Sequence, residues 1–339
     1  MAVSSAALSK QATGAGALDR LLLATQADME RVNALILRRA ESHVDMVPQL
    51  ARYLIEAGGK RLRPMLTVAA AQLFGGASGA EVKYAAAVEF MHNATLLHDD
   101  VVDESDLRRG RPAARMIWGN QASVLVGDFL LGQAFMMMVE AGDLGALGVL
   151  SKAATIIAEG EVFQLAKAKD LSTTAAEYSQ VIHAKTATLF AAAAEVGAMA
   201  GGADAAGREA LRAYGEELGL AFQLVDDVLD YRGESDTLGK NTGDDLREGK
   251  MTLPLILALE AANPAEREII IAALGVAETP DGVMEKVVSI FERHKSLERT
   301  VEQADLHVRK ARAALDVLPP SPMRTLLSDI AEFYVSRAY

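Results

Sequence analysis

The stretch "LLHDDVVDESDLRRGRP", residues 96–112, gathers negative charge directly after an apolar segment and sets arginines beside it. Within it, Asp99, Asp100 and Asp103 form the pattern D-D-x-x-D. On a helix, positions 99 and 103 lie on one face, with their Cβ atoms roughly 6 Å apart. Carboxylates that close repel each other unless a cation lies between them or water screens them. A solvated helix end would explain one acidic run, but the apolar residues before this one favour a metal site.

The same pattern recurs in "FQLVDDVLDY", residues 222–231, as Asp226, Asp227 and Asp230. Each cluster ends an apolar helical run, so in a helical fold the two can face each other across a cavity. Oxygen ligands without cysteine or clustered histidine suit Mg²⁺, which binds a few carboxylates together with substrate phosphates. One such cluster is weak support for a site and two in matching context are strong, so we predict a magnesium and diphosphate site.

Helical periodicity dominates the rest of the chain and predicts an all-α protein. Apolar residues recur at spacings of three and four, and aromatic residues make up only 5% of the 339 residues, which suits close helix packing. We expect a long helix over 80–103, a helix interrupted at Pro48, and a long polar loop over 232–251. Residues 1–19 are predicted to be a flexible N-terminus and 20–339 a single helical bundle around a central active-site cavity.

Composition limits the classes of function. A formal net charge of −12 argues against a nucleic-acid partner, because phosphate backbones require a basic surface. The absence of cysteine excludes disulfides, thiolate metal sites and a cysteine nucleophile. No run reaches the roughly 18 uninterrupted apolar residues of a membrane span, and the first residues lack the features of a signal peptide. We therefore expect a cytoplasmic protein.

Basic side chains that could hold phosphate accompany the aspartate clusters. They are Arg108 and Arg109, then Lys60, Arg61 and Arg63 in "GGKRLRP", and Lys185, Lys240 and Lys250. A basic loop alone would be a solvated surface, but beside two aspartate clusters the set implies two diphosphates, one held through Mg²⁺ and one directly. His92 lies seven residues before Asp99 on the same helix stripe, and Gln223 lies three before Asp226. A lone histidine is more often a core residue, and its place on this stripe favours ligand contact.

At these residues the sequence resembles the trans-isoprenyl diphosphate (polyprenyl) synthase family, from about residue 30 to the C-terminus. "LLHDDVVDESDLRRG" and "FQLVDDVLDYRGESDTLGKNTGDDLREGK" are similar to its two aspartate-rich motifs, and "GGKRLRP" and "AKTATLF" also match. The resemblance is to the long-chain branch of octaprenyl and decaprenyl diphosphate synthases, which make the ubiquinone side chain. It implies the isoprenoid synthase fold, a homodimer, three Mg²⁺ ions and condensation of isopentenyl diphosphate with farnesyl or geranylgeranyl diphosphate. A product of that length also implies transient membrane contact at release.

The resemblance also assigns roles to individual residues. Mg²⁺ on the allylic diphosphate would be bound by Asp99 and Asp103, and a third Mg²⁺ by Asp226 and Asp230. The allylic diphosphate itself would be contacted by Arg108, Lys185, Thr186, Gln223 and Lys240, and Lys250 is a further substrate-binding residue. Isopentenyl diphosphate would be bound by Lys60, Arg63, His92 and Arg109. The catalytic set is Asp99, Asp103, Arg108, Lys185, Asp226 and Lys240. No side chain is an obvious base, so the departed diphosphate is expected to accept the proton.

Product length is predicted to depend on the residues before the first cluster. Ala94 is the expected gate because, in the family, a bulky residue near this position marks short-chain enzymes. On a bare helical wheel Thr95 is better placed than Ala94 to line the cavity, and Phe135 is expected at the far end of the tunnel. For the neighbouring methionines 136–138, ordinary core packing is the favoured interpretation of at least two.

Three alternatives remain open on the sequence alone. A terpene cyclase would share the fold and metal chemistry but normally lacks paired D-D-x-x-D motifs and the "GGKRLRP" loop. A phosphohydrolase is suggested by His98–Asp99 but would need further clustered histidines. A non-catalytic subunit of a heteromeric synthase would be expected to have degraded aspartate motifs, and both are whole here.

Overall fold

The computed structural model describes residues 16–337 except 57, 58, 60, 77, 233–242, 277–279 and 281. Apart from one short hairpin, the secondary structure of these residues is helical, which confirms the predicted fold class. The elements of the first half are α2 (Ala17–Arg39), α3 (Met46–Glu56), α4 (Leu62–Leu73), α5 (Ala80–Val102), β1 (Leu107–Arg108), β2 (Arg111–Pro112), α6 (Ala114–Trp118), α7 (Asn120–Ala141) and α8 (Leu144–Lys167). Those of the second half are α9 (Ala175–Ile182), the π-helical turn η1 (His183–Ala187), α10 (Thr188–Ala200), α11 (Ala205–Arg232), α13 (Asp244–Arg247), α14 (Leu253–Ala261), α15 (Pro264–Ala273), α16 (Val283–Arg293), α17 (Ser296–Ala314), the 3₁₀ turn η2 (Leu315–Val317) and α18 (Pro322–Ser336).

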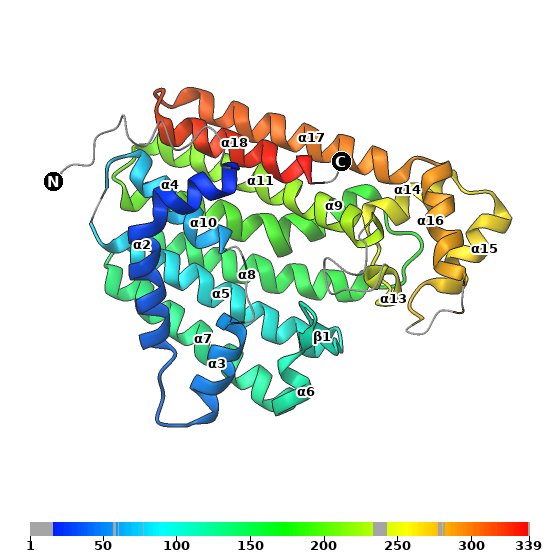
Figure 1. Cartoon of the computed structure of the whole chain (residues 1–339), viewed down its shortest axis with the longest axis horizontal. Coiled ribbons are helices and arrows are strands. Elements are labelled where there is room, and N and C mark those ends of the chain that lie inside the picture. The colour runs from blue at the N-terminus through cyan, green and yellow to red at the C-terminus, as the bar shows by residue number, and fades with distance from the viewer. Residues whose placement is uncertain are drawn as a thin grey trace.

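Long helices run side by side through the centre of the bundle (Figure 1). The α5 helix packs against α4 and α7, and α10 packs against α4, α8 and α11. The α17 and α18 helices cover α11, along the upper edge of Figure 1. Alanine-rich segments such as "FAAAAEVGAMA" in α10 bring these axes close together, because small side chains allow close backbone approach. The two aspartate clusters therefore end two of the most buried helices, α5 and α11.

Local sequence signals explain many helix boundaries. The α9 helix begins with a capping box in which Thr174 and Glu177 satisfy each other's backbone amides, and α15 begins with the same arrangement at Asn263 and Glu266. The long helix predicted over 80–103 is confirmed, with Asp103 as its C-cap. The predicted break at Pro48 is wrong: the chain breaks between α2 and α3, and Pro48 lies in the first turn of α3. A proline is tolerated there because amides of the first turn have no partner within the helix.

The predicted domain boundary and the predicted loop are only partly described by the structure. Helix α2 begins at Ala17, three residues before the predicted boundary at residue 20, and residues 1–15 lie outside the described part of the chain. Within the expected loop over 232–251, residues 244–247 form the short helix α13, and residues 233–242 are outside the described part. Lys240 lies in that gap.

Among the described helices, α7 is long and apolar enough to cross a bilayer by length and composition alone. Its buried residues include Leu130 and Met137, and the helix packs along α5. A core helix of a globular protein has the same properties. The methionines at 137 and 138 are fully buried, which confirms core packing for two of the three.

Candidate active site

The first aspartate cluster lies at the C-terminal end of α5, where two lysines from distant segments reach it. Lys185 Nζ lies 3.5 Å from Asp99 Oδ2 and 2.8 Å from Glu161 Oε2. Lys250 Nζ lies 3.0 Å from Asp103 Oδ2 and 2.5 Å from Glu248 Oε2. The side chains of Asp99, Asp103, Lys185 and Lys250 are 13%, 17%, 23% and 26% exposed, so the group opens to solvent without lying on the surface.

The middle residue of this cluster, Asp100, points the other way and is fully buried. Arg108 Nε and Nη2 both donate to Asp100 Oδ1, at 2.7 and 2.6 Å. The β1–β2 hairpin turns the chain back and places Arg108 on this carboxylate. Arg108 was predicted to bind the allylic diphosphate; that role stays a prediction, and the structure adds an anchoring contact that the sequence did not suggest.

The second cluster divides its roles in the same way along α11. Asp226 is exposed, Asp230 is partly buried, and Asp227 is buried between α9 and α11. The hydroxyl of Tyr178 donates to Asp227 Oδ2, and Gln223 Nε2 donates to Asp227 Oδ1 at 2.8 Å. Asp230 accepts the backbone amide of Asp245 at 3.2 Å. In each D-D-x-x-D, therefore, the second aspartate is an anchor and the first and third are more open to solvent.

Lys185 and Thr186 reach the site because the helix widens at η1. A π-helical turn contains one extra residue per hydrogen-bonded ring, and such turns occur frequently at functional sites. Two glycines make room for it: a Cβ at Gly160 would lie 2.5 Å from the Cβ of Ala184, and one at Gly219 would lie 2.6 Å from the Cα of Ala187. Thr186 Oγ1 donates to Gln223 Oε1 at 2.8 Å, which joins two residues predicted to contact the allylic diphosphate.

A separate basic group forms where α4 and α5 meet. Arg63 Nη1 lies 3.3 Å from His92 Nε2, and its guanidinium stacks over the Phe190 ring at 4.3 Å. Because arginine can only donate, His92 Nε2 accepts, and the neutral ring carries its proton on Nδ1. Burial and the neighbouring arginines hold the pKa of His92 well below its usual value. Burial also lowers the pKa of Arg63 to about 10, which is still high enough for Arg63 to be cationic at neutral pH.

Arg109 and Lys60 were also predicted to bind isopentenyl diphosphate with Arg63 and His92. The guanidinium of Arg109 lies against Gly59, where an added Cβ would be 2.7 Å from Nη1, so the "GGKRLRP" loop and the segment after the first cluster meet. Lys60 lies outside the described residues. The structure thus brings Arg63, His92 and Arg109 together.

The charges around the clusters suit an added cation. Burial raises the pKa of Asp99; Lys185 opposes that effect and Asp103 adds to it. Burial would lower the pKa of Lys250, but Asp245, Asp103 and Glu248 raise it above its usual value. The charge of Asp245, whose amide is bonded to Asp230 of the second cluster, therefore acts on Lys250 as that of Asp103 does.

The donor set determines how a metal could be held. Among the described residues, no three histidine, cysteine, aspartate or glutamate side chains gather closely enough to hold a metal ion by themselves. Asp99 and Asp103 supply two carboxylates on one face, and burial, with Asp103 nearby, raises the pKa of Asp99. This set fits a cation that takes its remaining ligands from substrate phosphates and water.

The predicted product-length residues lie on the same helix as the first cluster. Ala94 is buried, whereas Thr95 and His92 are partly exposed, as Asp99 is. Thr95 Oγ1 donates to the carbonyl of His92 at 2.8 Å. Thr95 is more exposed than Ala94, and Phe135 on α7 is partly exposed; the roles of all three in product length stay predictions.

Sequence reasoning missed several residues of the site. Asp100 and Asp227 were visible as the second aspartates of their motifs, but their opposite orientation was not. Glu161, which holds Lys185, lies in the apolar segment "EGEVFQL" and carried no signal of its own. Tyr178 lies seven residues before Lys185, outside the motifs that indicated the site.

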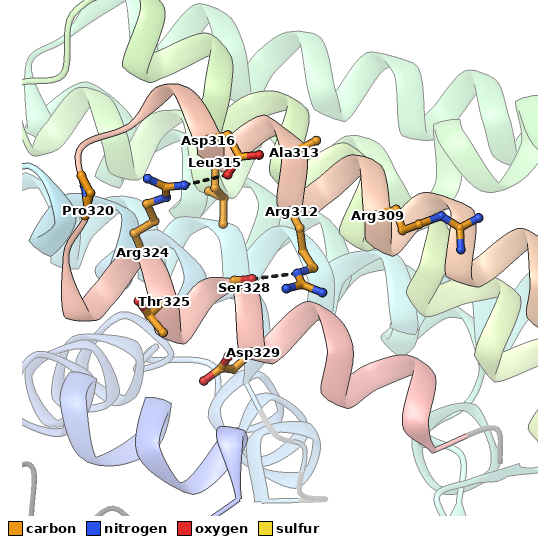
Figure 2. A pocket seen from close by; sticks show the side chains of 10 residues that line it. All are labelled: Arg309, Arg312, Ala313, Leu315, Asp316, Pro320, Arg324, Thr325, Ser328 and Asp329. Atoms are coloured by element: carbon orange, nitrogen blue, oxygen red, sulfur yellow. Dashed lines mark hydrogen bonds and ion pairs between the residues drawn. The ribbon is translucent and has the colours of Figure 1, made fainter.

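A cavity elsewhere in the structure is not part of this site. It measures about 630 Å³ and lies between α17 and α18 (Figure 2). In Figure 2, Arg324 pairs with Asp316 at 2.7 Å and Arg312 donates to Ser328 at 2.9 Å. None of its lining residues belongs to the aspartate clusters or to the predicted basic groups.

The chain is similar to known proteins over most of its length. A sequence profile of the family described as polyprenyl synthetase matches residues 44–291. The octaprenyl diphosphate synthase of Escherichia coli (strain K12) is 46% identical over 322 residues, covering 94% of this chain and 99% of the relative. A crystal structure of a polyprenyl synthase from Caulobacter crescentus CB15, complexed with calcium and isoprenyl diphosphate, matches with a TM-score of 0.91 and 51% identity over 96% of this chain and 99% of its own. That of a decaprenyl diphosphate synthase from Rhodobacter capsulatus matches with a TM-score of 0.90 and 49% identity over 95% and 99%.

Proposed function

This chain belongs to the polyprenyl synthetase family, in its long-chain branch, and from that premise we propose that it adds isopentenyl diphosphate units to farnesyl diphosphate or geranylgeranyl diphosphate in the all-trans configuration. The observation that supports the reaction best is the meeting of the first aspartate cluster with Lys185 and Lys250. Two carboxylates at the end of α5 and a lysine from each of two distant segments converge there, with the charges that a diphosphate and its counter-ions require. The products we propose are octaprenyl or decaprenyl diphosphate, precursors of the ubiquinone side chain.

The first step is departure of the allylic diphosphate. Asp99 and Asp103, together with Asp226 and Asp230, would hold Mg²⁺, which would supply Lewis-acid stabilisation of the leaving group. We propose three ions; the calcium in the Caulobacter crescentus structure supports a divalent cation at such a site. Lys185 lies on Asp99 and can turn toward the diphosphate, with Thr186 beside it. These side chains stabilise negative charge that develops only as the C–O bond breaks, so they act on the transition state.

The second step is attack on the allylic cation by the double bond of isopentenyl diphosphate. Arg63 and Arg109 offer fixed donors for the second diphosphate, and the neutral His92 ring keeps one N–H donor on Nδ1. We assign one diphosphate to these groups and the other to Lys185 and Lys250, with the reacting carbons between them. Proton loss then goes to the departed diphosphate, since no described side chain at the site is an obvious base.

The reaction is tested by incubating purified protein with Mg²⁺, farnesyl diphosphate and labelled isopentenyl diphosphate. Products would be extracted, dephosphorylated and sized by chromatography. Label in chains of about C40–C50 would support the proposal. Hydrolysis or cyclisation of farnesyl diphosphate without chain growth would contradict it in favour of a phosphohydrolase or a terpene cyclase. No activity until a second polypeptide is added would indicate a subunit of a heteromeric enzyme.

We propose that the enzyme is a homodimer that pairs through α7 and α8. Leu125, Met136 and Val139 are exposed and, with Phe129 and Gly132 between them, follow a spacing of four and three along one face of α7. On α8, Val162 and Leu165 are also exposed. Exposed apolar side chains that gather on packed neighbouring helices favour an interaction surface. Light scattering after size exclusion should show a dimer for wild type and a monomer for Leu125→Glu; a wild-type monomer at micromolar concentration would contradict the proposal.

Cytoplasmic location and transient membrane contact remain part of the proposal. A prenyl chain of this length is insoluble in water, so its release needs a lipid phase. Adding liposomes should raise the steady-state rate of a product-limited enzyme without changing the first turnover. An unchanged rate in the presence of liposomes would argue against membrane contact at release.

A further inference from the structure

We propose that Tyr178 is a positioning residue for the second aspartate cluster, holding Asp227 so that Asp226 and Asp230 stay directed toward the diphosphate. The inference rests on the proposed function, because it assigns a residue to that reaction. Tyr178 lies outside both aspartate motifs, on α9, and its ring does not have to touch substrate to act.

A continuous chain of hydrogen bonds connects Tyr178 to a predicted substrate contact. The Tyr178 hydroxyl donates to Asp227 Oδ2, Gln223 Nε2 donates to Asp227 Oδ1 at 2.8 Å, and Thr186 Oγ1 donates to Gln223 Oε1 at 2.8 Å. Both carboxylate oxygens of Asp227 are therefore occupied by side-chain donors. Asp227 is only 2% exposed, so it serves as an anchor for its neighbours on α11.

The hydroxyl contact restrains a ring that has free space beside it. Tyr178 is 5% exposed and lines a cavity of about 360 Å³ between α9, α11, α14 and α17, together with Ile182, Leu224 and Leu257. Packing alone leaves volume next to the ring, so the bond to Asp227 contributes to its position. Tyr178→Phe should therefore remove this restraint without forcing any atoms together.

The position of Tyr178 in the chain gives this bond a second consequence. Helix α9 continues directly into η1, and Lys185 and Thr186 follow Tyr178 by seven and eight residues. One contact thus connects the second aspartate cluster on α11 to the turn that carries the groups for the allylic diphosphate. Losing it should loosen that diphosphate site and leave the group around Arg63 and His92 unaffected.

The first cluster provides an internal comparison. Its middle residue, Asp100, is anchored by the cation Arg108, whereas Asp227 is anchored by a neutral hydroxyl and a neutral amide. A neutral anchor places no positive charge beside Asp226 and Asp230. The second cluster therefore keeps its attraction for a cation while its geometry is held, which is what a positioning residue there must provide.

The test compares Tyr178→Phe with Tyr214→Phe. Tyr214 is a buried tyrosine on α11 whose hydroxyl donates to the carbonyl of Leu327 at 2.7 Å, away from the site, so it controls for loss of a buried hydroxyl. Calorimetric titration with inorganic diphosphate in Mg²⁺, without turnover, should show a Kd raised roughly tenfold in Tyr178→Phe, the size expected for a lost hydrogen bond to a carboxylate. The half-saturating Mg²⁺ concentration should rise with it, while KM for isopentenyl diphosphate changes less than about twofold. Tyr214→Phe should match wild type in all three measurements.

A double-mutant cycle then tests whether Tyr178 acts through Asp227. Asp227→Asn keeps the volume of the anchor, and if Tyr178 acts through Asp227, adding Tyr178→Phe to Asp227→Asn should weaken diphosphate binding little further. Independent, additive losses would overturn the proposal, as would wild-type diphosphate binding in Tyr178→Phe. If wild type and Tyr214→Phe form long chains and Tyr178→Phe binds diphosphate as wild type does, only this inference fails. If wild type forms no long chains, the proposed function fails.

Discussion

Replacing Arg108 by alanine should destabilise the protein as well as slow it, because Asp100 is fully buried and no other side chain bonds its carboxylate in the described part of the chain. One oxygen, Oδ2, already lacks a hydrogen-bond partner, so Oδ1 depends on the two bonds from Arg108. Removing one partner of a buried ion pair costs about 3–5 kcal/mol. Arg108 is 27% exposed, which places the expected loss at the lower end, about 3 kcal/mol. At about 2 °C per kcal/mol for a large domain, the melting temperature should fall by roughly 6 °C.

The matched control is Asp100→Asn combined with Arg108→Ala. Removing both charges leaves no unpaired carboxylate, so the double variant should recover much of the lost stability. Thermal unfolding followed by circular dichroism measures stability, and steady-state kinetics measure activity. If diphosphate binding is the second role of Arg108, the double variant regains its melting temperature but not its kcat. An Arg108→Ala protein that melts within 1 °C or so of wild type would refute the anchoring argument.

Four further predictions concern the site. Asp99→Ala should lower kcat by orders of magnitude with an unchanged helical signal, because its contribution is made in the transition state; near-normal turnover in Mg²⁺ would remove it from the metal site. Arg109→Ala should raise KM for isopentenyl diphosphate, and Lys185→Ala should raise KM for the allylic substrate, each about ten- to a hundredfold because each variant loses a charge-assisted contact worth about 1.5–3 kcal/mol. The reverse pattern in initial-rate kinetics would show that the two substrate sites have been assigned the wrong way round. Ala94→Phe should shorten products to roughly C15–C20 as judged by chromatography, since Ala94 is buried five residues, about 7.5 Å, before Asp99; unchanged long chains would place the length determinant elsewhere. Because the pKa of His92 is lowered on folding, the unfolded chain binds a proton that the folded protein does not, so stability should fall as pH drops below about 6.5; chemical unfolding between pH 7 and 5 should show a flatter profile for His92→Gln, and identical profiles would contradict it.

Local patterns in the sequence predicted the helical class, the long helix before Asp103 and both aspartate clusters. Helical periodicity and the D-D-x-x-D spacing are properties of residues within one or two turns of each other, so a linear reading contains them. The break near Pro48 was misplaced because one proline fits either between helices or within a first turn, and only the packing of α2 and α3 decides between them.

Pairing across the fold required the tertiary structure. Lys185 meets Asp99, Lys250 meets Asp103 and Tyr178 meets Asp227 because the fold brings together segments far apart in sequence, and no local pattern encodes which residues then touch. The division within each cluster has the same origin. Two identical D-D-x-x-D motifs specify which residues share a helix face, but whether a face meets another helix or solvent depends on the helices packed around it, and that packing buries the second aspartate of each motif.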